Sequence, residues 1–206
     1  MEPLLHPGWP ARLASGPVEL QPLRRRDAAE WSRVRLANEQ WLAPWEPTAP
    51  APWAARHTPA AFRAMRRAAA QRARAGTSLP FAVRVEGRLA GQVTVDNIVR
   101  GALRSGHLGY WIDRAVTGRG LASLAVALVC DHAFGRAGLH RLQADIRPEN
   151  LASQRLVERL GFRREGLLRR YLDIDGDWRD HYTYALLADE VPGSVLGRWR
   201  SLTGGP

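Results

Sequence analysis

Two glycines, Gly118 and Gly120, stand two residues apart in the segment RAVTGRGLAS at residues 114–123. Glycine lets a backbone approach a ligand closely, and the N–H groups of a helix that begins here would attract phosphate oxygens. Arg119, between the glycines, offers a guanidinium for the same negative charge. The segment lacks the third glycine of a dinucleotide fingerprint and the Gly-Lys-Ser/Thr of a P-loop. Taken alone, it indicates a phosphate-binding loop or a tight strand-to-helix turn equally well.

A second segment, RPENLASQRLVERLGF at residues 147–162, passes from a strand through a helix to another strand. Asn150 is suited to cap this helix, and Ser153 follows three residues later. Capping alone accounts for both residues. Arg155 and Arg159 are then typical of a solvated helical face.

The elements that must position these segments alternate along the chain. Predicted strands cover residues 18–23, 80–85, 89–98, 107–113, 139–146, 162–174 and 178–187, and predicted helices cover 27–38, 58–75, 120–136 and 150–160. Asp27 and Thr58 are suited to cap the first two helices, and Asp175-Gly176 is a strong hairpin turn pair. The pattern predicts one mixed α/β domain over residues 18–190, between Pro- and Gly-rich segments at 1–17 and 191–206 that are expected to be loose.

Composition limits the class of protein further. The 206 residues have 45% hydrophobic and 24% charged side chains, as in an ordinary globular domain. The net charge of +10 arises from 30 arginines, with no lysine, against 20 acidic residues, and the arginines are scattered along the chain. This charge is consistent with a polyanionic ligand but does not identify it. The lone Cys130 excludes an internal disulfide, and no Cys/His cluster has zinc spacing, so no metal is predicted. Prolines interrupt the N-terminal segment, and a cytoplasmic protein is expected.

In this order, the Gly-x-Gly loop, the Asn-x-x-Ser helix and Leu160-Gly161-Phe162 resemble the GNAT superfamily of N-acetyltransferases. The resemblance implies a mixed, mostly antiparallel sheet of about seven strands, V-split between the fourth and fifth, with helices on both faces. It also implies acetyl-CoA as the cofactor. The residues implied to bind it are Trp111, Ile112, Thr117, Gly118, Arg119, Gly120, Leu121, Ala122, Ser123, Asn150, Ser153 and Arg155. Ala115 departs from the Gln or Arg of many members, which removes one polar contact.

Three further segments resemble one branch, the RimJ-type ribosomal-protein-alanine N-acetyltransferases. They are NEQWLAPWEP at 38–47, NIVRG at 97–101 and DGDWRDH at 175–181. The branch implies an acceptor α-amine on a protein N-terminus, with candidate acceptor contacts at Trp41, Trp45, Glu46, Asp96, Asn97 and Tyr171. Related sequences also act on other amines, so a small-molecule or aminoglycoside acetyltransferase is an alternative. A non-catalytic acetyl-CoA sensor or an RNA-associated module is an alternative of another class.

The resemblance implies direct attack of a neutral amine on the acetyl thioester. It places a backbone N–H donor for the thioester oxygen at a bulge in the fourth strand, near Tyr110 and Trp111. It places a donor for the departing thiolate at Ser153, because the tyrosine of many relatives falls at Val157. Asp145 is the candidate base, or else a strand-edge carboxylate paired with an arginine such as Arg147.

Two surfaces keep open interpretations at this stage. The tryptophans of residues 41–53 form either a rigid wall for a peptide or a hydrophobic cluster that covers the sheet. The arginines of the helix at 58–75 are either a solvated face or a weak contact with the ribosome or its RNA. A monomer and a homodimer are both consistent with the sequence.

Overall fold

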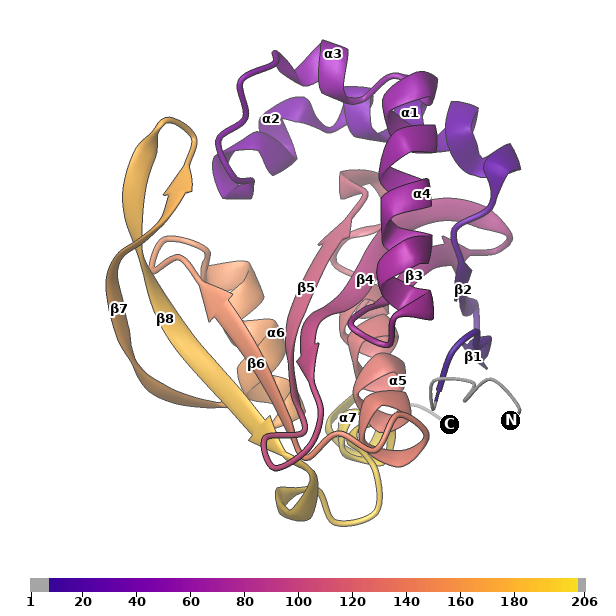
Figure 1. Ribbon diagram of the computed structural model, residues 1–206. Helices are drawn as coiled ribbons and strands as arrows, with labels where there is room; N and C mark the ends of the chain where they lie inside the picture. The colour runs from indigo at the N-terminus through magenta and orange to yellow at the C-terminus, as the bar shows by residue number, and fades with distance from the viewer. Residues whose placement is uncertain (1–7, 204–206) are drawn as a thin grey trace.

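A computed structural model describes residues 8–203 as one sheet of eight strands in the order β1-β2-β3-β4-β5-β6-β8-β7, with helices on both faces (Figure 1). The strands are β1 Leu13–Ser15, β2 Val18–Pro22, β3 Leu79–Val85, β4 Arg88–Val99, β5 Ser105–Ile112, β6 Arg141–Ile146, β7 Arg163–Ile174 and β8 Asp177–Leu187. The helices are α1 Ala28–Ala37, α2 Glu39–Leu42, α3 Trp53–Arg56, α4 Pro59–Arg74, α5 Leu121–Gly135, α6 Leu151–Leu160 and α7 Val195–Thr203. Every predicted strand and helix has its counterpart, and the mixed α/β fold is confirmed.

The sheet is split between β5 and β6. These two strands pair in parallel only from Ser105–Arg141 to His107–Gln143, whereas the other neighbouring strands pair antiparallel. Beyond that short ladder the two strands separate toward α2 (Figure 1). They are the fourth and fifth of the predicted strands, so the expected position of the split is confirmed. β1 is the additional strand, and it makes eight strands rather than about seven.

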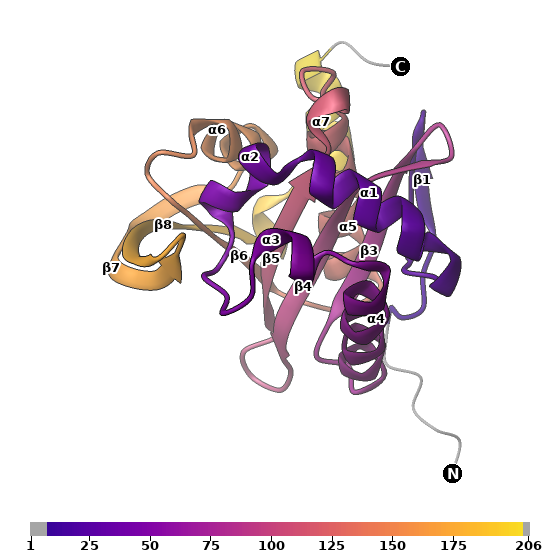
Figure 2. The same cartoon turned by 90° about the horizontal axis from the view of Figure 1, so that it is seen from above.

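Each face of the sheet buries its own apolar cluster. Phe81 and Val83 of β3 pack into the main core with α5, while Ala82 between them packs with Trp31 of α1 and Phe62 of α4. This alternation follows from the two-residue period of a strand. Figure 2 shows α1 and α4 on one side of the strands and α5 behind them. None of the helices within residues 8–203 is long and apolar enough to cross a membrane.

The two segments expected to be loose contain regular structure. β1 lies within residues 1–17, and α7 lies within residues 191–206. The carboxylate of Asp131 on α5 accepts hydrogen bonds from the N–H groups of Val195 and Leu196, at 2.7 and 3.0 Å, and Val195 is fully buried. The cap of α7 therefore comes from a residue far away in the sequence, which a local reading cannot find. The expectations for residues 1–7 and 204–206 lie outside the described residues.

Candidate active site at the split of the sheet

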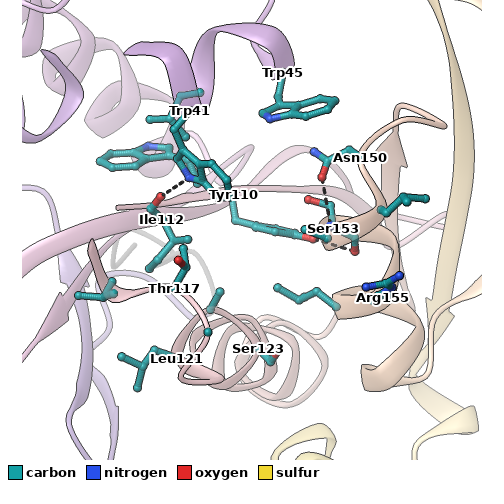
Figure 3. A pocket seen from close by; sticks show the side chains of 18 of the residues that line it. Trp41, Trp45, Tyr110, Ile112, Thr117, Leu121, Ser123, Asn150, Ser153 and Arg155 are labelled. Atoms are coloured by element: carbon teal, nitrogen blue, oxygen red, sulfur yellow. Dashed lines mark hydrogen bonds between the residues drawn. The ribbon is translucent and has the colours of Figure 1, made fainter. Parts of the chain in front are cut away.

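A cavity of about 640 Å³ lies where the end of β5, the N-termini of α5 and α6, and the segment around α2 meet (Figure 3). Most of the residues predicted to bind cofactor or acceptor line it. They are Trp41, Trp45, Glu46, Tyr110, Trp111, Ile112, Thr117, Gly118, Gly120, Leu121, Ala122, Ser123, Asn150, Ser153 and Arg155. Residues scattered over more than a hundred positions are thus brought to one place by the fold.

The N-terminus of α5 forms one side of this cavity, and its geometry suits an anion. Gly118 and Gly120 adopt φ angles of 77° and 72°, a left-handed conformation that costs other residues about 1–2 kcal/mol. Gly120 is the cap residue, so the N–H groups of the first turn, from Leu121 onward, have no partner within the helix. These N–H groups and the helix dipole favour a phosphate. Arg155 and Arg159 line the same cavity from α6 and add positive charge.

The first turn of α6 faces the end of β5 across the cavity. The Asn150 side chain caps α6 by accepting a hydrogen bond from the Ser153 N–H at 3.1 Å. The Tyr110 hydroxyl donates to the Ser153 carbonyl at 3.3 Å, and the Tyr110 ring extends from β5 toward α6 (Figure 3). Burial raises the pKa of Tyr110, so this hydroxyl remains a donor. Val157, one turn later, is fully buried in the core and does not line the cavity.

The backbone N–H of Tyr110 points into the split. In an antiparallel ladder, alternate residues bond to the neighbouring strand. The N–H of Asp113 donates to the carbonyl of Ala90 on β4, at 2.7 Å, so Ile112 and Tyr110 direct their backbone groups away from β4. The Trp41 indole accordingly reaches the Ile112 carbonyl at 3.2 Å. The ladder has no register shift at Tyr110, so the predicted bulge is wrong here, but the divergence of β6 leaves the same N–H directed into the gap.

The segment from α2 to Trp45 spans the open end of the split. Trp41 bonds to Ile112 at the end of β5, and Arg147, at the end of β6, donates to the Pro44 carbonyl at 2.7 Å. The Arg147 guanidinium also lies 5.4 Å from the centre of the Trp45 ring, a cation–π contact. The segment therefore bridges the two strands that have separated, and closes the cavity over Tyr110.

A buried arginine fixes the acidic side chain of this segment. Arg35 on α1 forms an ion pair of 2.6 Å with Glu46 and a hydrogen bond of 2.9 Å with His57. Its guanidinium lies 4.7 and 4.9 Å from the rings of Trp53 and Trp111. Burial, followed by the charge of Arg35, lowers the pKa of His57 to about 4, so a neutral ring accepts from Arg35. The tryptophans of this segment divide between two places: Trp41 and Trp45 line the cavity, and Trp53 belongs to a buried cluster.

Asp145 lies beside the split on the opposite face of the sheet from the Tyr110 side chain. Its carboxylate is 3.4 Å from His107 Nδ1 and accepts hydrogen bonds from Gln143 at 3.1 Å and from Tyr171 at 3.4 Å. Burial raises the pKa of Asp145, but hydrogen bonds led by the one from His107 outweigh it and hold the pKa below its usual value. Arg147, the partner considered for Asp145, instead pairs with Glu149 at 3.1 Å.

Five predicted site residues do not line the cavity: Arg119, Asp145, Asp96, Asn97 and Tyr171. Arg119 lies 3.6 Å from Glu86 at the surface, and Asp96 lies 3.5 Å from Arg72 of α4. Asn97 is exposed where the register of β4 against β5 shifts. Asp145 and its partner Tyr171 lie on the face of the sheet opposite the Tyr110 side chain.

Residues 18–163 match the family described as "Acetyltransferase (GNAT) domain". This chain belongs to the GNAT acetyltransferase family. Over 185 residues this GNAT enzyme is 30% identical to the [Ribosomal protein uS5]-alanine N-acetyltransferase of Escherichia coli, covering 88% of the chain and 94% of that protein. It is 44% identical over 100 residues to the Probable N-acetyltransferase YjcK of Bacillus subtilis, of which it spans 55%.

Solved structures agree with the fold of this GNAT acetyltransferase. The structure titled "Mycobacterium smegmatis RimJ in complex with CoA-disulfide" superposes with a TM-score of 0.93 at 43% identity, covering 97% of both chains. The ribosomal-protein-S5-alanine acetyltransferase of Vibrio fischeri superposes with a TM-score of 0.80 at 27% identity, covering 88% of this chain and all of that chain. The predicted RimJ-type membership is confirmed.

Several residues that build the site of this GNAT acetyltransferase were not predicted. Asn38, 4% exposed, donates to Asp113 at 2.9 Å and accepts from the Arg114 N–H at 2.9 Å, which ties α2 to the start of the glycine loop. Arg35 and Arg147 hold the segment between Trp41 and Glu46. The sequence indicated a role for Asn38 only through its position in a branch motif. Its partners Asp113 and Arg114 lie 75 and 76 residues away, so no local pattern points to them.

Proposed function

We propose that this enzyme transfers the acetyl group of acetyl-CoA to the N-terminal α-amine of a protein in the cytoplasm, with a ribosomal protein as the acceptor. One observation carries the proposal: a single cavity connects an anion-binding helix N-terminus with the gap between β5 and β6. The names of two relatives that match most of the chain, the uS5-alanine acetyltransferase and RimJ, support the ribosomal acceptor.

The cavity has the chemistry that coenzyme A requires. Its pyrophosphate would lie against the N–H groups that follow Gly120, with Arg155 and Arg159 nearby, and the largely apolar wall suits the pantetheine arm. When bound, the thioester supplies an activated acetyl group. The Tyr110 N–H, directed into the gap, would donate to the thioester oxygen as negative charge develops there.

The amine would approach from the face of the sheet that carries Asp145. An α-amine has a pKa of about 7.7–8.0, so a modest base is enough to complete the transfer. The amine nitrogen bonds to the acetyl carbon while the carbon–sulfur bond breaks. Asp145, kept ionised by His107, Gln143 and Tyr171, would receive the amine proton directly or through water. The Ser153 hydroxyl, at the cavity wall, would donate to the departing thiolate.

The acceptor peptide would enter along the segment that closes the cavity. Trp41 and Trp45 offer an apolar wall, and Glu46 places a carboxylate at its edge for a cationic N-terminus. Asp96 and Asn97 lie farther along the sheet and would contact the peptide beyond its first residue, while Tyr171 would act through Asp145.

The test uses the full chain with acetyl-CoA and three classes of amine: peptides beginning with Ala or Ser, aminoglycosides and polyamines. Thiol release and product mass are followed, and the same peptides with blocked N-termini serve as controls. Acetylation restricted to free peptide α-amines supports the proposal. Turnover of small amines alone overturns the acceptor class, and coenzyme binding without turnover of any amine overturns catalysis.

The proposed role of Ser153 is tested with a matched pair of variants. Ser153→Ala is expected to lower kcat about tenfold or more while changing the KM for acetyl-CoA little, because the lost hydrogen bond forms mainly in the transition state. Ser201→Ala, an exposed serine that does not line the cavity, should leave both constants unchanged. Equal kcat values in the two variants would remove Ser153 from the mechanism.

A further inference from the structure

The exposed side of α4 carries a row of arginines. Arg63, Arg66, Arg67 and Arg74 fall within an arc of about 100° on the helix surface and extend over about 16 Å. Phe62, Ala69 and Ala73 form the buried side of the same helix, so the arginines do not contribute to the core. The arrangement gives one face of the molecule four guanidinium groups in a line.

These four charges are not neutralised. α4 contains no acidic residue, and within residues 8–203 none of the four arginines forms an ion pair. The Arg66 Nε atom is buried without a hydrogen-bond partner among the described residues. If the arginines served only to keep this face soluble, acidic residues three or four positions away from them would stabilise the helix through ion pairs. α4 has none.

A shallow hollow of about 410 Å³ lies along this row, lined by Arg66, Arg67, Ala70, Gln71 and Arg74. It contains donors and no carboxylate, as a site for phosphate groups requires.

A second arginine-lined hollow shows the contrast. There, Arg12, Arg24, Arg26 and Arg84 are accompanied by Glu19, Asp27 and Glu30. Arg84 pairs with Asp27 at 2.7 Å and lies 3.5 Å from Glu30. That hollow holds three carboxylates for four arginines, whereas the hollow on α4 holds three arginines and no carboxylate. The feature that singles out α4 is therefore uncompensated charge and not the number of arginines.

We propose that the arginine row of α4 binds the phosphate backbone of structured RNA and docks the enzyme beside its acceptor. The choice of RNA over another polyanion rests on the proposed ribosomal acceptor. Arg72, on the opposite flank of α4, pairs with Asp96, which lies across from His107 on the acceptor face of the sheet. RNA on the arginine row would thus lie about one helix diameter, 10–12 Å, from the acceptor face.

The test measures binding of the full chain to a fluorescein-labelled RNA duplex over a range of salt concentrations. Four phosphate contacts predict a slope of log Kobs against log[salt] of about −3 to −4, using the value for a nucleic-acid duplex. Replacing Arg63, Arg66, Arg67 and Arg74 by Gln, which keeps the helix propensity, should remove most of this slope. A matched variant carries Gln at the exposed Arg12, Arg25, Arg26 and Arg88 and loses the same charge.

Loss of binding confined to the α4 variant supports the proposal. Equal weakening of RNA binding in both variants would assign the binding to net charge alone. Tighter binding of polyglutamate than of RNA would assign the arginine row to an acidic protein partner. Either result overturns the proposal. Peptide acetylation by the α4 variant should equal that of the unmodified enzyme. If neither the unmodified enzyme nor the two variants acetylate peptides, the proposed function fails. The comparison of RNA binding between the two variants still shows whether the arginine row binds RNA.

Discussion

Replacement of Asn38 by alanine is the sharpest test of how the site is assembled. This side chain is buried and touches no part of the cavity, yet it joins α1, α2 and the start of the glycine loop. Its amide donates to the Val34 carbonyl and the Asp113 carboxylate, both at 2.9 Å, and accepts from the Arg114 N–H at 2.9 Å.

The magnitude follows from those contacts. A hydrogen bond to a charged group contributes about 1.5–3 kcal/mol, and one between neutral groups contributes about 1 kcal/mol. Losing the Asp113 and Arg114 contacts should therefore lower the free energy of unfolding by about 3 kcal/mol. For a chain of this length, that corresponds to a fall in Tm of about 6–12 °C. The KM for acetyl-CoA should also rise, because the glycine loop loses the anchor at its start.

The assay is urea unfolding followed by tryptophan fluorescence, together with steady-state kinetics at varied acetyl-CoA. Gln40→Ala, at an exposed neighbouring amide, is the matched control and should change stability by less than about 0.5 kcal/mol. If Asn38→Ala unfolds at the same urea concentration as Gln40→Ala, the link that we describe between α2 and the glycine loop does not stabilise the fold.

Three further outcomes are expected. Because the pKa of His57 is lowered to about 4 in the folded chain, the unfolded chain binds a proton there between pH 6.5 and 4 and the folded chain does not. The free energy of unfolding should therefore fall by up to about 3 kcal/mol as the pH drops through that window. In urea titrations at several pH values, His57→Gln should make the free energy of unfolding depend less on pH. Gly120→Ala should weaken coenzyme binding in calorimetry, because its φ is 72° and the added Cβ would lie 3.4 Å from Trp199; tight binding by this variant would argue against the glycine cradle. Asp131→Asn should lower Tm by about 2–6 °C through the weaker cap on α7, whereas an unchanged Tm would show that the cap contributes little.

Most of the fold follows from local patterns. Strand alternation, the long apolar helix α5 and the Asp175-Gly176 turn each depend on neighbours in the chain, so their elements appear where the sequence predicts them. The anion-binding part of the site is local for the same reason. Glycine takes the positive φ seen at Gly118 and Gly120 without a steric cost, and Asn is a preferred cap residue, as at Asn150 of α6.

The remainder of the site depends on contacts between residues far apart in the chain. The sequence could not place Asn38 against Asp113, Arg35 against Glu46 and His57, or Asp131 beneath α7. It also predicted a bulge at Tyr110, where the free N–H arises from the divergence of β6.

The sequence by itself determined the glycine loop, the capped helix after it and the family to which they belong, because each is encoded within a few consecutive residues. Only the tertiary structure decided that Tyr110 faces Ser153 across a split sheet, that Trp41 and Arg147 close the cavity, and that Asp145 stands on the opposite face. Hydrogen bonds and ion pairs between distant residues depend on how the elements pack, and no local pattern records that packing.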